Sequence, residues 1–326
     1  MTAELVPPQG GELDAELLAG LPALDEATAR HVRKPRNTER NYAGDWRTWQ
    51  RYAAQLRIPE RAATIGSFAG FVLWLRRDGK APATVERRVY GVTVTLRSLG
   101  VEVPQEAADG ARLALEAYRR DLAEAGETRG RGRAGVVTIR DVRAMSAALP
   151  ATLRGLRDRA ALLVGIGAAA RRSELAGLLC RDITVHEQEG LKVGIRYGRS
   201  GARRPAIKRG SGLTDPVAAW TAWRDAAGLD PAGPAFLTID RHGNLGRRMS
   251  PASVGDIVIN ACELAGIPRK TWHGVRAGLA TEARRAGHDA KTIAELGGWS
   301  PTSRVLSAYM RIVEEWAGDA TAGIGL

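Results

Sequence analysis

Apolar residues recur every three or four positions between residues 37 and 125, which is the period of an amphipathic helix. The two clearest stripes comprise Tyr42, Trp46, Trp49, Ala53 and Leu56, and then Val85, Val89, Val92, Leu96 and Leu99. Helices are predicted from Asn37, over 65–77, from Pro82 to Gly100, and over 106–125. Proline suits the first turn of a helix and glycine its end. Residues 30–125 therefore predict an all-helical domain.

The pattern changes in the second half of the chain. Helical segments over 139–148 and 155–165 precede three short segments (182–190, 191–198 and 203–210) that read as strands joined by turns. Helical periodicity then returns over 217–227, 251–265, 274–286, 290–296 and 301–313. Residues 138–326 predict a mostly helical domain with a small antiparallel β-sheet, so the fold class is mainly α with two domains.

Two further segments differ from both domains. Residues 126–137 include "GETRGRGRAG", with four glycines and three arginines in ten residues, which predicts an extended linker. Its arginines can follow a phosphate backbone or simply be solvated. Residues 1–29 hold six acidic and no basic residues and predict a weakly ordered tail.

Charge adds the first indication of a partner. The net charge is +12, and because the tail holds six of the 36 acids, residues 30–326 carry 48 basic against 30 acidic residues, or +18. Such a field favours a polyanion, most often nucleic acid. The alternative is a basic protein that is merely soluble.

Other classes of protein are not favoured. The sequence has no apolar run long enough for a membrane span and no pattern typical of a secretory signal. Cys180 and Cys262 lack the spacing of a disulfide framework or a structural zinc site. These features predict a cytoplasmic protein without a metal or another cofactor.

The segment "GIGAAARRSELAG" offers two readings. Arg171 and Glu174 stand at the start of a predicted helix, where anions are attracted, but they can equally form a surface ion pair. "GIGAAA" also matches a loose dinucleotide-binding fingerprint. We reject that match because a helix precedes it and no βαβ units follow.

The segment 271–311 places several polar groups where a core would use apolar residues. His273 and Arg276 project from the same face of one helix. An arginine can hold two phosphate oxygens, and a histidine can transfer a proton near neutral pH. Trp299 can donate a hydrogen bond to phosphate, and Tyr309 offers a hydroxyl nucleophile. Each residue alone is more often structural, but together with Arg171 they supply the parts of phosphoryl transfer.

The combination R-x-x-E, H-x-x-R, G-G-W and a late tyrosine resembles the tyrosine recombinase, or phage integrase, family over residues 30–320. The tryptophan, where most members have a second histidine, is most similar to Cre recombinase. The resemblance implies a C-shaped clamp on double-stranded DNA, with residues 30–125 as the core-binding domain and residues 138–326 as the catalytic domain. It also implies site-specific strand exchange that needs no ATP.

The resemblance also assigns roles to residues. It implies that Arg171 and Arg276 bind the scissile phosphate and that Glu174 supports Arg171. His273 would handle protons and Trp299 would bond the phosphate. The nucleophile, Tyr309, would form a 3′-phosphotyrosyl link and release a 5′-hydroxyl.

One position departs from the family pattern. Members usually carry a lysine in the turn between the second and third strands, as general acid toward the leaving oxygen. Here the turn reads "IRYGRSGARRP", and Arg199 occupies that place. Arginine is a poor proton donor. Arg199 is favoured by position and Lys208 by chemistry, with Lys192 as a third candidate. Without a general acid, the chain would be a slow enzyme or a DNA-binding protein that does not cleave. A type IB topoisomerase is a further alternative, because such enzymes share the chemistry of the tyrosine recombinases.

The resemblance finally implies a partner and an assembly. The partner would be DNA with paired inverted-repeat sites at the bacterial nucleoid, bound by a homo-oligomer, a tetramer on two sites. Exchange of the C-terminal tail would link the subunits, although the tail can also cap its own domain. The candidate DNA contacts are Arg47, Arg51, Arg87, Arg88, Arg129, Arg131, Arg247 and Arg248.

Overall fold

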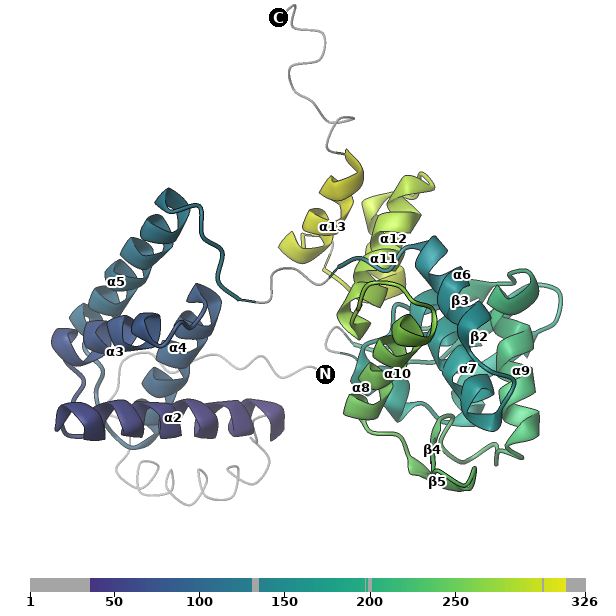
Figure 1. The fold of residues 1–326 in the computed structure, drawn as a ribbon, viewed down its shortest axis with the longest axis horizontal. Coiled ribbons are helices and arrows are strands. Elements are labelled where there is room, and N and C mark those ends of the chain that lie inside the picture. Colours follow the sequence, from purple (N-terminus) through teal and green to yellow (C-terminus); the bar gives the residue numbers. More distant parts are fainter. Residues whose placement is uncertain (1–35, 131–134, 197, 199–200, 301, 315–326) are drawn as a thin grey trace, which may run out of the picture. The chain divides into compact units, whose positions relative to one another are not determined.

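The computed structural model describes residues 36–130, 135–196, 198, 201–300 and 302–314. The chain divides into two compact units, Met1–Gly132 and Arg133–Leu326 (Figure 1). No helix within the described ranges is long and apolar enough to cross a membrane.

The first unit is built from helices. They are α2 (Arg36–Leu56), α3 (Ile65–Arg77), α4 (Pro82–Ser98) and α5 (Gln105–Glu124). Trp49, Tyr52, Phe68 and Phe71 fill its centre, and their rings lie 5.1 to 5.5 Å apart. The Tyr52 hydroxyl donates to the carbonyl of Ser67 at 2.9 Å, so this buried polar group is satisfied.

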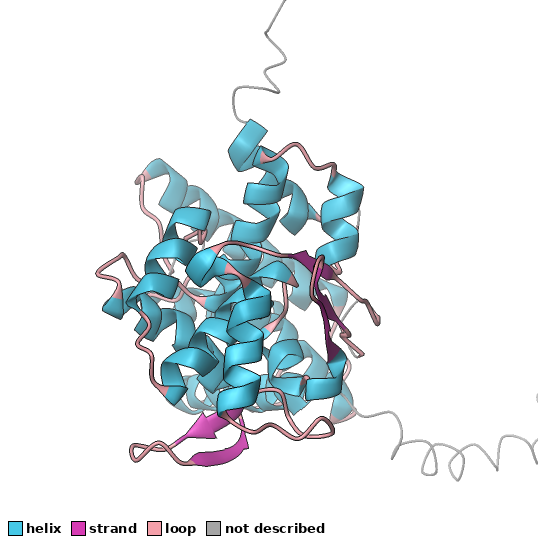
Figure 2. Cartoon of the chain, turned by 90° about the vertical axis from the view of Figure 1, so that its right-hand side faces the viewer, coloured by secondary structure: helices cyan, strands magenta, loops and turns pink. Residues whose placement is uncertain are grey.

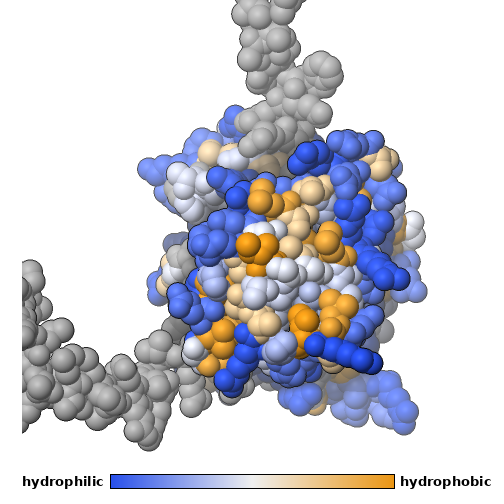
Figure 3. Space-filling view, turned by 90° about the vertical axis from the view of Figure 1, so that its left-hand side faces the viewer, coloured by the Kyte–Doolittle hydropathy of each residue, from blue (hydrophilic) through white to orange (hydrophobic). Residues whose placement is uncertain are grey.

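The two predicted stripes are buried only in part. Leu56 and Leu99, their last members, are 51% and 42% exposed, and each lies at the C-terminal end of its helix. Further apolar side chains reach the surface of this unit, and Figure 3 shows several orange areas separated mainly by side chains of intermediate hydropathy, with hydrophilic side chains around the edge.

The arginines predicted to contact DNA differ in their surroundings in this unit. Arg47 and Arg51 are exposed. Arg87 forms a 2.5 Å ion pair with the buried carboxylate of Asp45, whereas Arg88 is half-buried. Burial raises the pKa of Asp45, although its bond to Arg87 opposes this.

In the linker, Arg129 forms an exposed ion pair with Glu127 at 3.4 Å. Arg131 lies outside the described residues.

The second unit is mostly helical, with two small sheets (Figure 2). Its helices are α6 (Ile139–Ala148), α7 (Leu153–Gly167), α8 (Arg172–Gly177), α9 (Pro216–Ala226), α10 (Pro251–Leu264), α11 (Trp272–Arg285), α12 (Ala290–Gly297) and α13 (Arg304–Glu314). The antiparallel sheet β1-β2-β3 comprises Ile183–His186, Gly190–Val193 and Ala206–Lys208.

The second sheet is a hairpin that the sequence pattern did not predict. Its strands are β4 (Leu237–Ile239) and β5 (Leu245–Arg248), and β5 is exposed along its whole length. Both Arg247 and Arg248 lie on β5, where Arg248 donates to the carbonyl of Gly177 at 3.1 Å. A strand of three residues and an exposed strand of four carry too little alternation for a sequence pattern to detect.

A close approach between α7 and α11 positions the rest of this unit. A Cβ at Gly165 would lie 2.4 Å from the Trp272 ring, so only glycine lets the start of α11 pack here. The Trp272 indole N–H donates to the carbonyl of Ala170 at 2.8 Å. This contact fixes the start of α11 against the turn between α7 and α8.

Candidate active site

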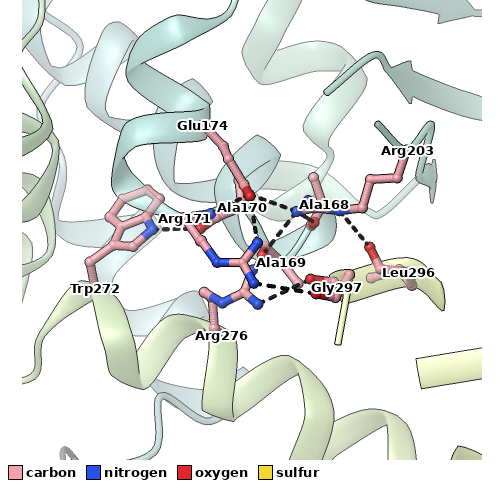
Figure 4. Close-up of polar contacts among 11 residues, drawn as sticks. Ala168, Ala169, Ala170, Arg171, Glu174, Arg203, Trp272, Arg276, Leu296 and Gly297 are labelled. Carbon is pink, nitrogen blue, oxygen red and sulfur yellow. Dashed lines mark hydrogen bonds and ion pairs between the residues drawn. The ribbon is translucent and has the colours of Figure 1, made fainter. Parts of the chain in front are cut away.

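The turn between α7 and α8 presents a row of carbonyl groups. Those of residues 168–170 accept hydrogen bonds from the side chains of Trp272, Arg276 and Arg203 (Figure 4). Ala169 has φ +44°, a left-handed conformation that costs a residue with a Cβ about 1–2 kcal/mol. "GIGAAA" therefore ends a helix and aims carbonyls at three side chains.

Arg171 stands next to this turn and is held by Glu174. Its Nη1 donates to Glu174 Oε1 at 2.6 Å, its backbone N–H donates to Oε2 at 2.8 Å, and its Nη2 donates to the carbonyl of Gly298 at 3.3 Å. The Glu174 side chain is only 2% exposed. Burial opposes its ionisation, but hydrogen bonds from Arg203 and Arg171 outweigh burial and lower the pKa of Glu174 to about 2. Glu174 is thus a fixed anion that orients Arg171.

Arg276 lies on α11, one turn after His273, and is 5% exposed. It donates to the carbonyls of Ala169 and Gly297, the latter at 3.0 Å. Its Cζ lies 4.5 Å from the centre of the Trp299 ring, a cation–π contact. Burial and the nearby charge of Arg171 lower the pKa of Arg276 to about 10, so it stays cationic at neutral pH.

Helix α13 brings Tyr309 to His273. The helix packs on α11 and α12 through a small apolar cluster that includes Ala280, Ile293 and Leu306. As a result, the Tyr309 hydroxyl lies 2.7 Å from His273 Nε2. Burial and the charge of Arg276 lower the pKa of His273, which favours the neutral imidazole at neutral pH. A neutral ring nitrogen can accept the phenolic proton.

A pocket of about 470 Å³ lies beside the His273–Tyr309 contact, and Tyr309 and Glu174 are not among the residues that line it. Its lining is Arg171, Arg172, Trp272, His273, Arg276, Gly298, Trp299, Ser300, Ser303 and Val305. Three guanidinium groups around one pocket suit a phosphate. Arg172, Ser300 and Ser303 were not predicted as site residues. The doubled arginine in "ARRSE" is the one signal that could have identified Arg172.

The end of α12 shapes the pocket through two glycines. A Cβ at Gly297 would lie 1.8 Å from the Trp299 ring, and Gly298 has φ +61°. This turn lets the Trp299 ring lie between Arg276 and Tyr309. The centre of the Trp299 ring is 6.4 Å from the centre of the Tyr309 ring.

The sequence offered Arg199, Lys208 and Lys192 as candidates for the general acid. Arg199 falls outside the described residues. Lys208 pairs with Gly190 at the end of the sheet remote from that turn, and forms an exposed 2.7 Å ion pair with Glu189. This placement does not favour Lys208. Lys192 is exposed on β2 and lines a different pocket. Within the described ranges, no three His, Cys, Asp or Glu side chains gather as a metal site requires.

Comparison with known proteins gives the same picture. The phage integrase family model matches residues 136–315. An integrase/recombinase XerD homolog of Selenomonas ruminantium is 28% identical over 274 residues, which cover 80% of this chain and 77% of that protein.

Solved structures show the same fold. A lambda integrase (residues 75–356) dimer bound to a COC′ core site has a TM-score of 0.59 at 14% identity, covering 90% of this chain and 94% of that one. XerH recombinase in a post-cleavage complex with a palindromic difH substrate has a TM-score of 0.55 at 16% identity, covering 84% and 75%. The particular likeness to Cre stays a prediction. Because the family model spans more than half of the sequence, the chain belongs to the phage integrase family of tyrosine recombinases.

Proposed function

We propose that this site-specific recombinase breaks and rejoins DNA strands with Tyr309 as its nucleophile. The observation that carries the proposal is the 2.7 Å contact between the Tyr309 hydroxyl and His273, beside a pocket lined by Arg171 and Arg276. A phenol is a weak nucleophile at neutral pH, so it needs a base and nearby cations, and this site offers both.

The chemistry follows from these positions. The Tyr309 oxygen attacks phosphorus and its proton passes to His273. The bond from phosphorus to the 5′-oxygen breaks, which leaves a 3′-phosphotyrosyl link and, after protonation, a free 5′-hydroxyl. Arg171 and Arg276 neutralise the charge on the equatorial oxygens.

In the second step, a 5′-hydroxyl from the partner strand attacks the same phosphorus and gives its proton to the group that protonated the leaving 5′-oxygen. The bond from phosphorus to the Tyr309 oxygen breaks, and that oxygen regains its proton from His273. The link conserves the bond energy, so the reaction implies no ATP. Protonation of the 5′-oxygen in the first step falls to one of Arg199, Lys192 and Lys208. Arg199 is favoured by its position in the turn, since Lys208 lies at the remote end of β3 and Lys192 lines a different pocket.

The proposed partner is double-stranded DNA with paired inverted-repeat sites at the bacterial nucleoid. The proposed assembly is a homotetramer on two such sites. A lambda integrase tetramer bound to a Holliday junction supports it, with a TM-score of 0.57 at 14% identity over 90% of this chain. The tail is proposed to link subunits. Its residues after Glu314 lie outside the described residues.

A nicked suicide substrate tests the function directly. We expect a covalent protein–DNA adduct on a denaturing gel when the full chain meets its site, because the nick lets the cleaved end diffuse away. Binding to the site without any adduct would instead favour a DNA-binding protein that does not cleave. Relaxation of supercoiled plasmids of any sequence would favour a type IB topoisomerase.

The rate of adduct formation should depend on pH through His273. The neutral form of His273 accepts the proton from Tyr309. Burial and the charge of Arg276 lower the pKa of His273. The rate should therefore fall only as the pH drops below the ordinary histidine pKa of about 6.5. Single-turnover rates against pH measure this, with His273→Gln expected to be slow and to lack the acidic limb. A limb at or above the ordinary histidine pKa would contradict the assignment.

A further inference from the structure

Arg203 connects three parts of the second unit. Its Nη2 donates to Glu174 Oε2 at 2.8 Å, and its Nε donates to the carbonyl of Leu296, in the last turn of α12, at 3.1 Å. The same Nη2 lies 3.4 Å from the carbonyls of Ala168 and Ala169 (Figure 4). One guanidinium thus joins the α7–α8 turn, the carboxylate that holds Arg171, and the end of α12.

The backbone of Arg203 joins a fourth part. It exchanges two hydrogen bonds with Ile195, of 2.9 and 3.0 Å, at the base of the β2–β3 turn. Its side chain therefore points inward from the hairpin that carries Arg199, the candidate general acid.

A role in stability alone does not explain this arrangement. The Arg203 side chain is 9% exposed, and its Nη1 is buried with no hydrogen-bond partner among the described residues. A buried, unpaired donor is costly, and replacing a buried ion pair by apolar groups is often neutral or stabilising. What the guanidinium does supply is a third hydrogen bond to Glu174, at the oxygen that also accepts from the Arg171 backbone N–H, while the other carboxylate oxygen accepts from the Arg171 guanidinium.

We propose that Arg203 is a positioning residue that ties Glu174 to the end of α12 and thereby fixes the orientation of Arg171. It has no place in the pocket that holds the scissile phosphate, and it acts through its neighbours. The carbonyls of Gly297 and Gly298, which accept from Arg276 and Arg171, directly follow the Leu296 carbonyl held by Arg203. Both phosphate-binding arginines are thus aligned by one buried side chain. This inference rests on the proposed function.

Arg203→Lys and Arg203→Ala test the proposal in the full chain with the nicked substrate. Lysine keeps the charge but cannot reach all acceptors, so we expect the single-turnover adduct rate at saturating DNA to fall about 10–100-fold, as when groups that orient metal ligands are removed. The affinity for the site should change little. The deficit should grow as the pH is lowered, because Glu174 loses a bond that keeps it ionised. Added guanidinium should restore part of the rate of Arg203→Ala.

The matched control is Arg157→Lys. Arg157 is another buried arginine of this unit, bonded to Asp158 at 2.6 Å and to the carbonyl of Leu237 at 3.2 Å. The Arg157→Lys variant should have a lower melting temperature than the wild type but the same pH dependence of the rate. A wild-type rate for Arg203→Lys, or a deficit that is independent of pH and matched by Arg157→Lys, would overturn the proposal. If the wild-type chain forms no adduct, the proposed function fails instead.

Discussion

Tyr309→Phe is expected to abolish the covalent adduct while leaving DNA binding intact. Phenylalanine keeps the ring that packs beside Trp299 but removes the oxygen 2.7 Å from His273. Without that oxygen no phosphotyrosyl link can form, and the loss should be on the order of 10⁴-fold or more, as when other covalent nucleophiles are removed. Adduct formation on the nicked substrate and a gel-shift titration measure the two properties separately.

Tyr118→Phe provides the matched control. Its hydroxyl donates to the carbonyl of Lys80 at 2.9 Å in the first unit, so the variant loses one hydroxyl and one hydrogen bond but no group of the pocket. It should form the adduct at the wild-type rate. Should Tyr309→Phe still form a phosphotyrosyl adduct, another tyrosine would be the nucleophile, and the reading of the site would be wrong.

Arg171→Ala should cut the rate of cleavage by about 10²-fold or more and leave the affinity for the site largely unchanged. The guanidinium is held by Glu174 and the carbonyl of Gly298 before any substrate arrives, and such preorganised donors act mainly on the transition state. Single-turnover adduct formation at saturating DNA isolates this effect from binding.

For comparison, Arg224→Ala removes an arginine of α9 that is paired only with its neighbour Asp225 in the described structure, at 2.8 Å. This variant should cleave at the wild-type rate. If Arg171→Ala lost affinity alone and cleaved normally once saturated, Arg171 would be a DNA-binding residue without a role in the chemical step.

Local signals in the sequence account for most of the helices. The predicted segments 65–77 and 139–148 have the bounds of α3 and α6, because Thr64 and Thr138 cap these helices through their side chains. Pro82 likewise begins α4. The hairpin β4–β5 escaped prediction, since β4 is only three residues long and β5 is exposed along its whole length, which leaves too short an apolar alternation to detect.

The site was predictable only as a set of residue types. The sequence singled out His273, Arg276 and Tyr309 because their chemistry is unusual at those spacings, and the structure brings them together. It could not distinguish Arg203 from its neighbour Arg204. Whether an arginine side chain points inward or outward depends on how the strands pair. Nor did it show that the register of β3 places Lys208 at the remote end of the sheet.

Sequence alone thus determined the helical periodicity, the linker composition, the basic charge and the residue types that can carry phosphoryl transfer. Tertiary structure alone decided which groups meet. Arg171 bonds to a carbonyl 127 positions away and Arg203 to one 93 positions away. Contacts at such separations are set by how helices pack around a shared core, and the local pattern of side chains along the chain does not encode that packing.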